Sequence, residues 1–289
     1  MKSFVLLLAV VSLARGSILP GNNVYGYLKD SVERATKLRE AEEKYFSEGS
    51  RIIGGVPAAL GQYPYQAGLI TDIIGITNGN GICGGSLISA SRVLTAAHCW
   101  FDGVNQVWRI TVVLGSVTLF SGGTRIESSA IAVHPSYSAV LARNDIATIY
   151  LPAPVTINDF IAPVSLPFGP ELSETFVNNN AIASGFGAVE NGGSVSPFLN
   201  HVNLNIITND ACRLAFPLIL QDSNICTSGL GNNGVCGGDS GGPLVVIRDN
   251  RRVLVGVTSF GSTLGCESSA PSAFARITSF NSFILEHLG

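Results

Sequence analysis

The chain begins with a predominantly apolar stretch over residues 4–14, shortly after Lys2 and interrupted only by Ser12. These eleven residues are fewer than the ~20 that a helix needs to cross a bilayer. Small residues at Ala14 and Gly16 fit the positions that a signal peptidase reads. The pattern therefore predicts a secretory signal peptide over residues 1–16 and an exported protein.

Residues 17–51 have a different pattern, rich in charge. Glu33 and Lys37, like Glu40 and Lys44, stand at the i,i+4 spacing of helical ion pairs. The apolar positions form one thin stripe: Leu28, Val32, Ala35, Leu38 and Tyr45. We predict a marginal helix, and an activation propeptide rather than a domain, ending at Arg51.

The remaining residues, 52–289, are dense in short β-branched runs between glycine- and asparagine-rich turns, as at 109–114 and 244–247. This pattern is typical of an all-β sandwich or barrel. The end of the chain differs, because Thr278 or Ser279 is placed to cap a helix of about 278–288. Its apolar residues recur at helical spacing: Phe280, Phe283, Ile284 and Leu288.

Composition narrows the class further. All six cysteines lie after residue 51, and in an exported chain they favour disulfides over metal sites. Spacing alone permits fifteen pairings. Neither CxxC nor HExxH occurs, so we expect no metal. No basic run of the nucleic-acid-binding type and no later membrane span is present in the sequence.

The candidate chemistry begins with residues 238–243, Gly-Asp-Ser-Gly-Gly-Pro. Glycines beside Ser240 allow backbone amides to approach one point in space. Serine needs a base and an orienting acid to act as a nucleophile. His98 in Thr-Ala-Ala-His-Cys and Asp145 in Asn-Asp-Ile-Ala are the candidates. The other histidines, His134, His201 and His287, lack such a context, and we interpret them as surface or structural residues.

These three blocks, in the order His, Asp, Ser, resemble the chymotrypsin-like (trypsin-fold, S1-type) serine proteases. Further matching blocks lie at 52–55, 83–88, 184–187 and 259–261, so the resemblance covers residues 52–289. It implies two six-stranded antiparallel Greek-key β-barrels with a C-terminal helix. The first barrel would span about 52–160 and the second about 161–275.

The resemblance also implies roles. Ser240 would be the nucleophile, His98 the general base and Asp145 the residue that orients it, with the amides of Gly238 and Ser240 as the oxyanion hole. Ser259 would hydrogen-bond the Asp145 carboxylate. The implied disulfides are Cys83–Cys99, Cys212–Cys226 and Cys236–Cys266.

Activation and specificity follow from the same comparison. Cleavage between Arg51 and Ile52 would free an amine that pairs with Asp239. Gly234 stands where trypsins carry an aspartate, so the pocket has no negative charge to bind an Arg or Lys side chain. Because activation requires cleavage after Arg51, the enzyme would not activate itself, and a trypsin-like partner is implied.

The pocket walls would be Gly261 and Ser272. Gly261 leaves room for large side chains, and we expect cleavage after Phe, Tyr and Leu. Ser272 departs from the glycine of chymotrypsins and from the aspartate of crustacean collagenolytic proteases, and would narrow the pocket or add a hydroxyl.

The distribution of lysine is uneven. All four lysines precede residue 52, while residues 52–289 hold nine arginines and fourteen acids, a net charge of about −5. Arginine keeps its charge above pH ~12, whereas lysine loses it near ~10.4. In this the chain resembles digestive chymotrypsins of lepidopteran larvae, which work in an alkaline gut lumen. Lineage drift in Lys/Arg usage is the alternative.

The sequence therefore predicts a secreted, extracellular serine endopeptidase with a digestive role in the gut lumen, made as a zymogen and using no cofactor. Expected partners are protein and peptide substrates, a trypsin-like activating protease and protein protease inhibitors, with no nucleic acid or membrane, and the expected state is a monomer. Two alternatives stay open: a regulatory protease of a cascade, and a non-catalytic homologue acting as a binding module.

Overall fold

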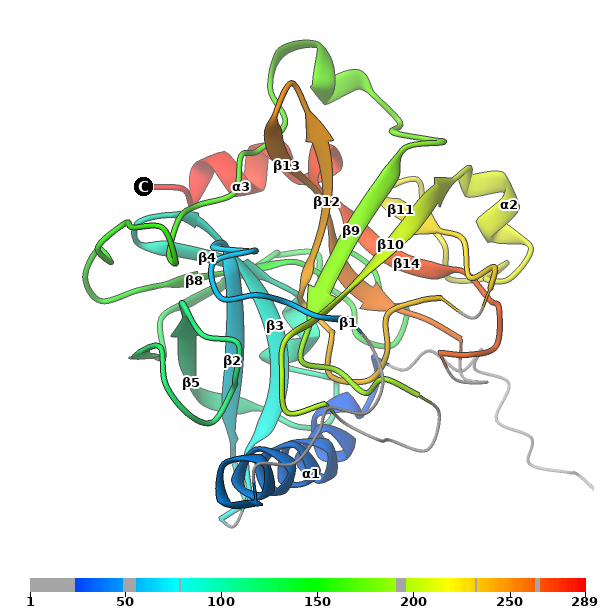
Figure 1. The fold of residues 1–289 in the computed structure, drawn as a ribbon. Helices are drawn as coiled ribbons and strands as arrows, with labels where there is room; N and C mark the ends of the chain where they lie inside the picture. Colours follow the sequence, from blue (N-terminus) through cyan, green and yellow to red (C-terminus); the bar gives the residue numbers. More distant parts are fainter. Residues whose placement is uncertain (1–23, 49–55, 78, 191–195, 232, 263–265) are drawn as a thin grey trace, which may run out of the picture.

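The computed structural model describes residues 24–48, 56–77, 79–190, 196–231, 233–262 and 266–289. The predicted signal peptide and the Arg51–Ile52 bond lie outside these residues. Two antiparallel sheets make up most of the described chain and lie side by side (Figure 1). The prediction of an all-β, two-barrel fold is confirmed, although each sheet has seven strands where six were predicted.

The first sheet has seven strands in the order β6-β5-β2-β3-β4-β8-β7. Their bounds are β2 Gln66–Ile73, β3 Gly81–Ser89, β4 Arg92–Thr95, β5 Val107–Leu114, β6 Thr124–Ser128, β7 Ile131–Val133 and β8 Ala147–Tyr150. The 3-10 turn η1, Ala97–Cys99, follows β4. Leu69, Leu87, Leu94, Ile110 and Ile149 are fully buried between these strands and form the centre of the first core.

The second sheet has the order β1-β10-β11-β14-β13-β12-β9, and β9 also pairs with β10. That extra pairing closes a six-stranded barrel, to which β1 is added at the edge. The bounds are β1 Val56–Pro57, β9 Asn180–Gly185, β10 Asn200–Ile207, β11 Asn224–Thr227, β12 Pro243–Arg248, β13 Arg251–Phe260 and β14 Ser272–Arg276, with the 3-10 turn η2, Gly169–Ser173, ahead of β9. The start of the expected first barrel therefore belongs to the second sheet.

The C-terminal helix is present, but its start differs from the prediction. Residues Ile277–Phe280 form a 3-10 turn, η3, and the α-helix α3 covers only Asn281–Glu286. Thr278 and Ser279 lie inside that turn, and the residue at the cap, Phe280, makes no side-chain capping bond. A tight first turn lets Phe280 and Phe283 reach the core, which outweighs capping.

The end of the chain packs on the first sheet. His287 Nδ1 and the Tyr150 hydroxyl are 2.6 Å apart, and Arg92 Nε donates to the His287 carbonyl at 3.0 Å. Arg92 begins β4, the strand that leads to η1. The C-terminal segment thereby stabilises the strand on which His98 depends.

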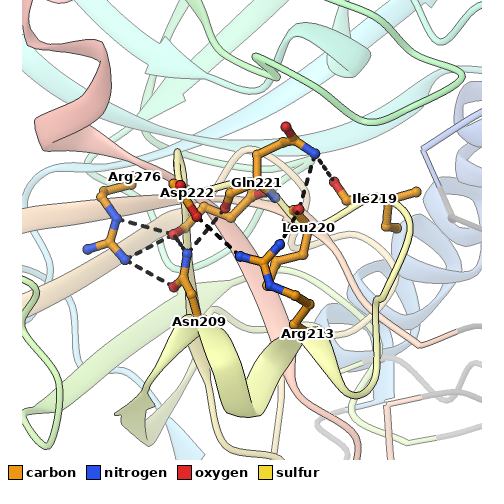
Figure 2. Close-up of polar contacts among 8 residues, drawn as sticks. Asn209, Arg213, Ile219, Leu220, Gln221, Asp222 and Arg276 are labelled. Atoms are coloured by element: carbon orange, nitrogen blue, oxygen red, sulfur yellow. Dashed lines mark hydrogen bonds and ion pairs between the residues drawn. The ribbon is translucent and has the colours of Figure 1, made fainter.

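A polar network holds helix α2, Asn209–Arg213, to the end of β14 (Figure 2). Arg276 donates to the Asn209 side chain at 3.2 Å, and Arg213 donates to Asp222 at 3.2 Å. The loop after α2 carries Phe216, whose ring meets that of Phe260 edge-to-face at 5.2 Å. Phe260 lines the cavity described below, so this network stabilises one wall of it.

The helix expected within residues 17–51 is α1, Tyr27–Glu48, and it lies against the first sheet (Figure 1). The predicted Glu33–Lys37 pair forms at 2.9 Å. Leu28 and Leu38 are fully buried and join the first core, whereas Val32 and Tyr45 are only half-buried. Among the described helices, none combines the length and the apolar character needed to span a bilayer.

Candidate active site

His98 and Asp145 come from neighbouring elements of the first sheet. His98 lies in η1, directly after β4, and Asp145 lies in the loop that enters β8, not on a strand. Since β4 pairs with β8 in register Thr95↔Ala147, the two residues meet. His98 Nδ1 is 2.7 Å from Asp145 Oδ2, and the His98 amide donates to Oδ1 at 2.9 Å.

The Asp145 carboxylate is held in its charged form by its partners. Ser259 donates its hydroxyl hydrogen to Oδ2 at 2.6 Å, as the resemblance implied. Burial alone favours the neutral acid, but the bonds from His98 and Ser259 outweigh it, so the pKa of Asp145 lies below its ordinary value. A carboxylate on Nδ1 requires the hydrogen there and leaves Nε2 as the basic nitrogen.

Ser240 lies in the tight turn that enters β12. Its carbonyl accepts from the Gly84 amide at 2.7 Å and lies 3.6 Å from Cys99 Sγ, beside the His98 segment. Gly238 has φ +108°, and a Cβ there would lie 2.7 Å from Gly187 Cα. Only glycine suits that position. Within the described residues, the amides of Gly238 and Ser240 donate no hydrogen bond, as an oxyanion-binding pair requires.

The imidazole is covered in this structure. His98 is fully buried, and its Nε2 has no hydrogen-bond partner among the described groups. The ring of Tyr27, from α1, meets the imidazole edge-to-face with centroids 4.8 Å apart. Ser240 is 5% exposed. Helix α1 therefore covers the imidazole.

Asp239 occupies a second carboxylate site. Its oxygens accept from the amides of Gly187 and Cys236, each at 2.9 Å. A Cβ on Gly187 would lie 2.6 Å from the carboxyl carbon, so the glycine makes room for the acid. Burial raises the pKa of Asp239 above its ordinary value despite these two bonds. The described residues supply no cation to it; Arg51 and Ile52 fall outside them.

A cavity of about 490 Å³ extends beside Ser240. Gly261 and Ser272 line it, and a Cβ on Gly234 would lie 3.3 Å from Ser272 Oγ, which places Gly234 against the same wall. A Cβ on Gly261 would meet no atom of the described residues within 4 Å. The three predicted pocket residues therefore lie together, with open space at Gly261. Arg34 of α1 lines the mouth.

The disulfides have the pairing implied by the resemblance: Cys83–Cys99, Cys212–Cys226 and Cys236–Cys266. The first joins β3 to the turn that carries His98. The last joins the segment before Ser240 to the cavity wall. Cys83, Cys99 and His98 also group closely enough for a metal, but disulfide sulfurs are not thiolate ligands.

Several residues of the site were not predicted. Tyr27, Arg34 and Glu42 of α1 contact the cleft or its border, and Asp102 binds the start of the helix. The signal available in the sequence was the helical spacing itself, since Glu42 falls on the same face as Leu28 and Leu38. That spacing did not predict which surface of residues 52–289 the helix face would contact.

Comparisons with known proteins agree with this geometry. A family model described as Trypsin matches residues 52–284. The chain is similar to a collagenase of Hypoderma lineatum, with 38% identity over 83% of this chain and 88% of that protein. Brachyurin of Leptuca pugilator is 37% identical over 82% of this chain and 99% of that protein.

Serine protease 1 of Drosophila melanogaster is 37% identical over 83% of this chain and 86% of that protein. Among solved structures, one described as HL collagenase at 1.7 Å resolution superposes with a TM-score of 0.75 at 36% identity, covering 82% of this chain and 99% of the other.

Proposed function

The chain belongs to the trypsin family of serine proteases and is a serine endopeptidase, and from this premise we propose that it cleaves after Phe, Tyr and Leu as a digestive enzyme made as a zymogen. The observation that carries the proposal is the buried His98–Asp145 pair, together with a cavity beside Ser240 whose predicted specificity residues Gly261 and Ser272 carry no charge.

In the proposed mechanism, His98 Nε2 takes the hydroxyl hydrogen of Ser240 while its oxygen attacks the scissile carbonyl, and later protonates the leaving amine. Asp145 stabilises the imidazolium without taking the proton, consistent with its lowered pKa. The unused amides of Gly238 and Ser240 are suited to the oxyanion, and losing one such donor typically costs about 3 kcal/mol of barrier.

Substrate choice rests on Gly234, Gly261 and Ser272. A cationic side chain entering beside Gly234 would be buried without a counter-charge, which costs several kcal/mol. The open space at Gly261 supports entry of aromatic rings. Ser272 adds a hydroxyl to the wall, and we propose that it favours Leu relative to Tyr by narrowing the cavity.

Zymogen activation would proceed by cleavage after Arg51 by a trypsin-like protease. The new Ile52 amine would then pair with Asp239, whose pKa is raised by burial and which has no cation among the described residues. Pairing raises the amine's pKa above its usual ~7.7–8.0. The active arrangement is therefore present below that folded pKa and is lost as pH rises through it.

The family supports an extracellular location, and a gut lumen is our proposal. It rests on the lysine-free, arginine-bearing surface of residues 52–289, which stays charged in alkaline fluid, as in the lepidopteran digestive chymotrypsins that it resembles. The expected partners are dietary proteins and protein protease inhibitors, with the enzyme acting as a monomer.

The test is a peptide library digested by the Arg51-cleaved enzyme, with Gly261→Val as a matched variant. We expect cleavage after Phe, Tyr and Leu, and at least a tenfold loss of kcat/KM for Phe in the variant while Ala-directed cleavage is kept, because two methyl groups would fill the open space. Preference for Arg or Lys would overturn the assignment of the pocket. Failure of an organophosphonate to label Ser240 would overturn the mechanism.

A further inference from the structure

Helix α1 is attached to the protease domain, residues 52–289, through one continuous stripe. Leu28, Ser31, Ala35, Leu38 and Glu42 stand three or four residues apart and are each at most 2% exposed. A helix of 22 residues extends about 33 Å, and its described contacts run from His98 to the Leu119–Ser121 loop. A charged helix with a single narrow stripe is marginal alone, so its helical form depends on this docking.

The start of the helix is capped by the domain. The Leu28 amide donates to Asp102 Oδ2 at 2.7 Å, and the Gly26 amide donates to the Asp102 carbonyl at 3.1 Å. First-turn amides have no partner within their own helix, and a carboxylate there also meets the positive end of the helix dipole. Asp102 is fully buried and acts as an N-cap supplied by another part of the chain.

The far end of the buried stripe is held by a carboxylate. Glu42 accepts from the amides of Leu119 at 2.7 Å and Phe120 at 3.1 Å, and from the Ser121 hydroxyl at 3.2 Å. Burial raises its pKa although these bonds oppose the rise, and Arg125 lies near enough to favour the charge. An acid buried on a helix face is costly unless it is paired, so this recess is a specific site for it.

Both anchoring sites are stabilised by the domain's own bonds. Asp102 Oδ1 accepts from the amides of Val104 at 2.9 Å and Asn105 at 2.6 Å. In the 116–121 loop, Thr118 donates to the Ser121 carbonyl at 2.8 Å, and Arg125 donates to the Leu119 carbonyl at 2.9 Å. These contacts involve no residue of α1, so they do not depend on the helix.

Between the two anchors, α1 covers the chemistry. The Tyr27 ring lies on His98, and its hydroxyl donates to the Ile82 carbonyl at 3.0 Å. Arg34 packs so closely on Gly237 that a Cβ there would lie 3.0 Å from its Cδ. It also lines the mouth of the cavity beside Ser240. A substrate chain cannot occupy the cleft while these side chains do.

We propose that residues 24–48 are a cleft-blocking inhibitor of the protease domain, bound through Asp102 at one end and the Leu119–Ser121 recess at the other, and that the released segment binds the processed enzyme as a separate peptide. The inference rests on the proposed endopeptidase function. Inhibition by residues 24–48 would be independent of the Ile52–Asp239 pair, because the helix prevents substrate binding by occupying the cleft.

The basic residues of α1 provide a way to remove the inhibitor after its release. Lys29, Lys37 and Lys44 lie on α1, together with Arg34 and Arg39. Cleavage after Arg51 ends the covalent attachment, which lowers the effective concentration of the helix at the cleft from the millimolar range. The same trypsin-like activator then cuts the exposed basic positions of the released helix, removing the inhibitor.

The experiment uses the enzyme processed by trypsin, after trypsin has been inactivated, and a synthetic peptide of residues 24–48. Hydrolysis of a small Phe anilide reports inhibition. Fluorescence anisotropy of the labelled peptide with the Ser240→Ala chain, processed in the same way, reports binding without turnover. We expect competitive inhibition, and at least tenfold weaker binding of the Glu42→Gln peptide, because both Glu42 oxygens accept hydrogen bonds and the amide nitrogen that replaces one of them cannot accept.

Glu43→Gln is the matched control, since Glu43 is the exposed neighbour and the change in charge is the same; its affinity should stay within twofold. Equal loss in both variants, binding without competition, or cleavage of the peptide as an ordinary substrate would each overturn the inference. If the enzyme hydrolyses the anilide but neither binds the peptide nor is inhibited by it, the inference is contradicted and the proposed function is not. If the domain binds the peptide but neither hydrolyses the anilide nor reacts with a phosphonate, the proposed function is contradicted and the binding of the helix is not.

Discussion

Asp145 and Asp239 are both carboxylates set into the protease domain, yet their surroundings differ in kind. Asp145 has a histidine ring, a hydroxyl and an amide as donors, and its pKa is lowered. Asp239 has two backbone amides and, among the described residues, no cation, and its pKa is raised. The His98–Asp145 pair is therefore already formed in this structure, whereas no cation of the described residues balances Asp239.

The largest expected effect concerns Asp145. In the processed enzyme, Asp145→Asn should lower kcat about 10⁴-fold, because an amide at this position favours the wrong imidazole tautomer. Steady-state hydrolysis of a Phe anilide measures this. Ser259→Ala, which removes only one of the carboxylate's donors, is the matched control and should cost far less. A loss of tenfold or less in Asp145→Asn would contradict the role given to this pair.

A smaller effect is expected at Asp239. Asp239→Asn leaves the Ile52 amine buried without its partner, and breaking such a pair costs about 3–5 kcal/mol. Activity of the processed enzyme should fall by 100-fold or more, measured together with titration of reactive Ser240. Glu267→Gln, an exposed acid on the border of the same region, should leave activity within twofold. Full activity in Asp239→Asn would remove the proposed ion pair.

The smallest effects are on stability against pH, and they should have opposite signs. Asp145 has a lowered folded pKa, so its contribution to the unfolding free energy is complete above about pH 3.9 and is lost as pH falls through the folded value. Asp239 in the uncut chain has a raised folded pKa. The unfolding free energy therefore falls as pH rises from about 3.9 through that value.

Urea unfolding of the uncut Ser240→Ala chain between pH 3 and 7 measures both, with each Asn variant subtracted from the parent. The parent should gain stability over Asp145→Asn as pH rises toward 4, and lose it relative to Asp239→Asn at higher pH. Two differences of the same sign would show that these aspartates do not have the contrasting environments described.

Asp145 and Asp239 could both be identified from the sequence, since each lies in a short motif. The family pattern led to the His98–Asp145 pair, the Ser259 bond and all three disulfides. Motifs succeed there because this chemistry tolerates few residue types at each position. The C-terminal helix was less predictable, because the burial of Phe280 outweighed the capping propensity of Thr278 and Ser279.

By itself, the sequence determined the family, the residues able to carry out acyl transfer, the strand-rich character of residues 52–289 and the presence of helix α1, with only Leu28, Ala35 and Leu38 of its predicted stripe buried. Only the tertiary structure decided that β1 joins the second sheet, that Asp102 caps α1 and that Glu42 reaches the Leu119–Ser121 amides. The physical reason is that spacing along a chain defines one face of a helix or strand. The surface that meets this face is made of residues distant in sequence, and is created only when the sheets pack.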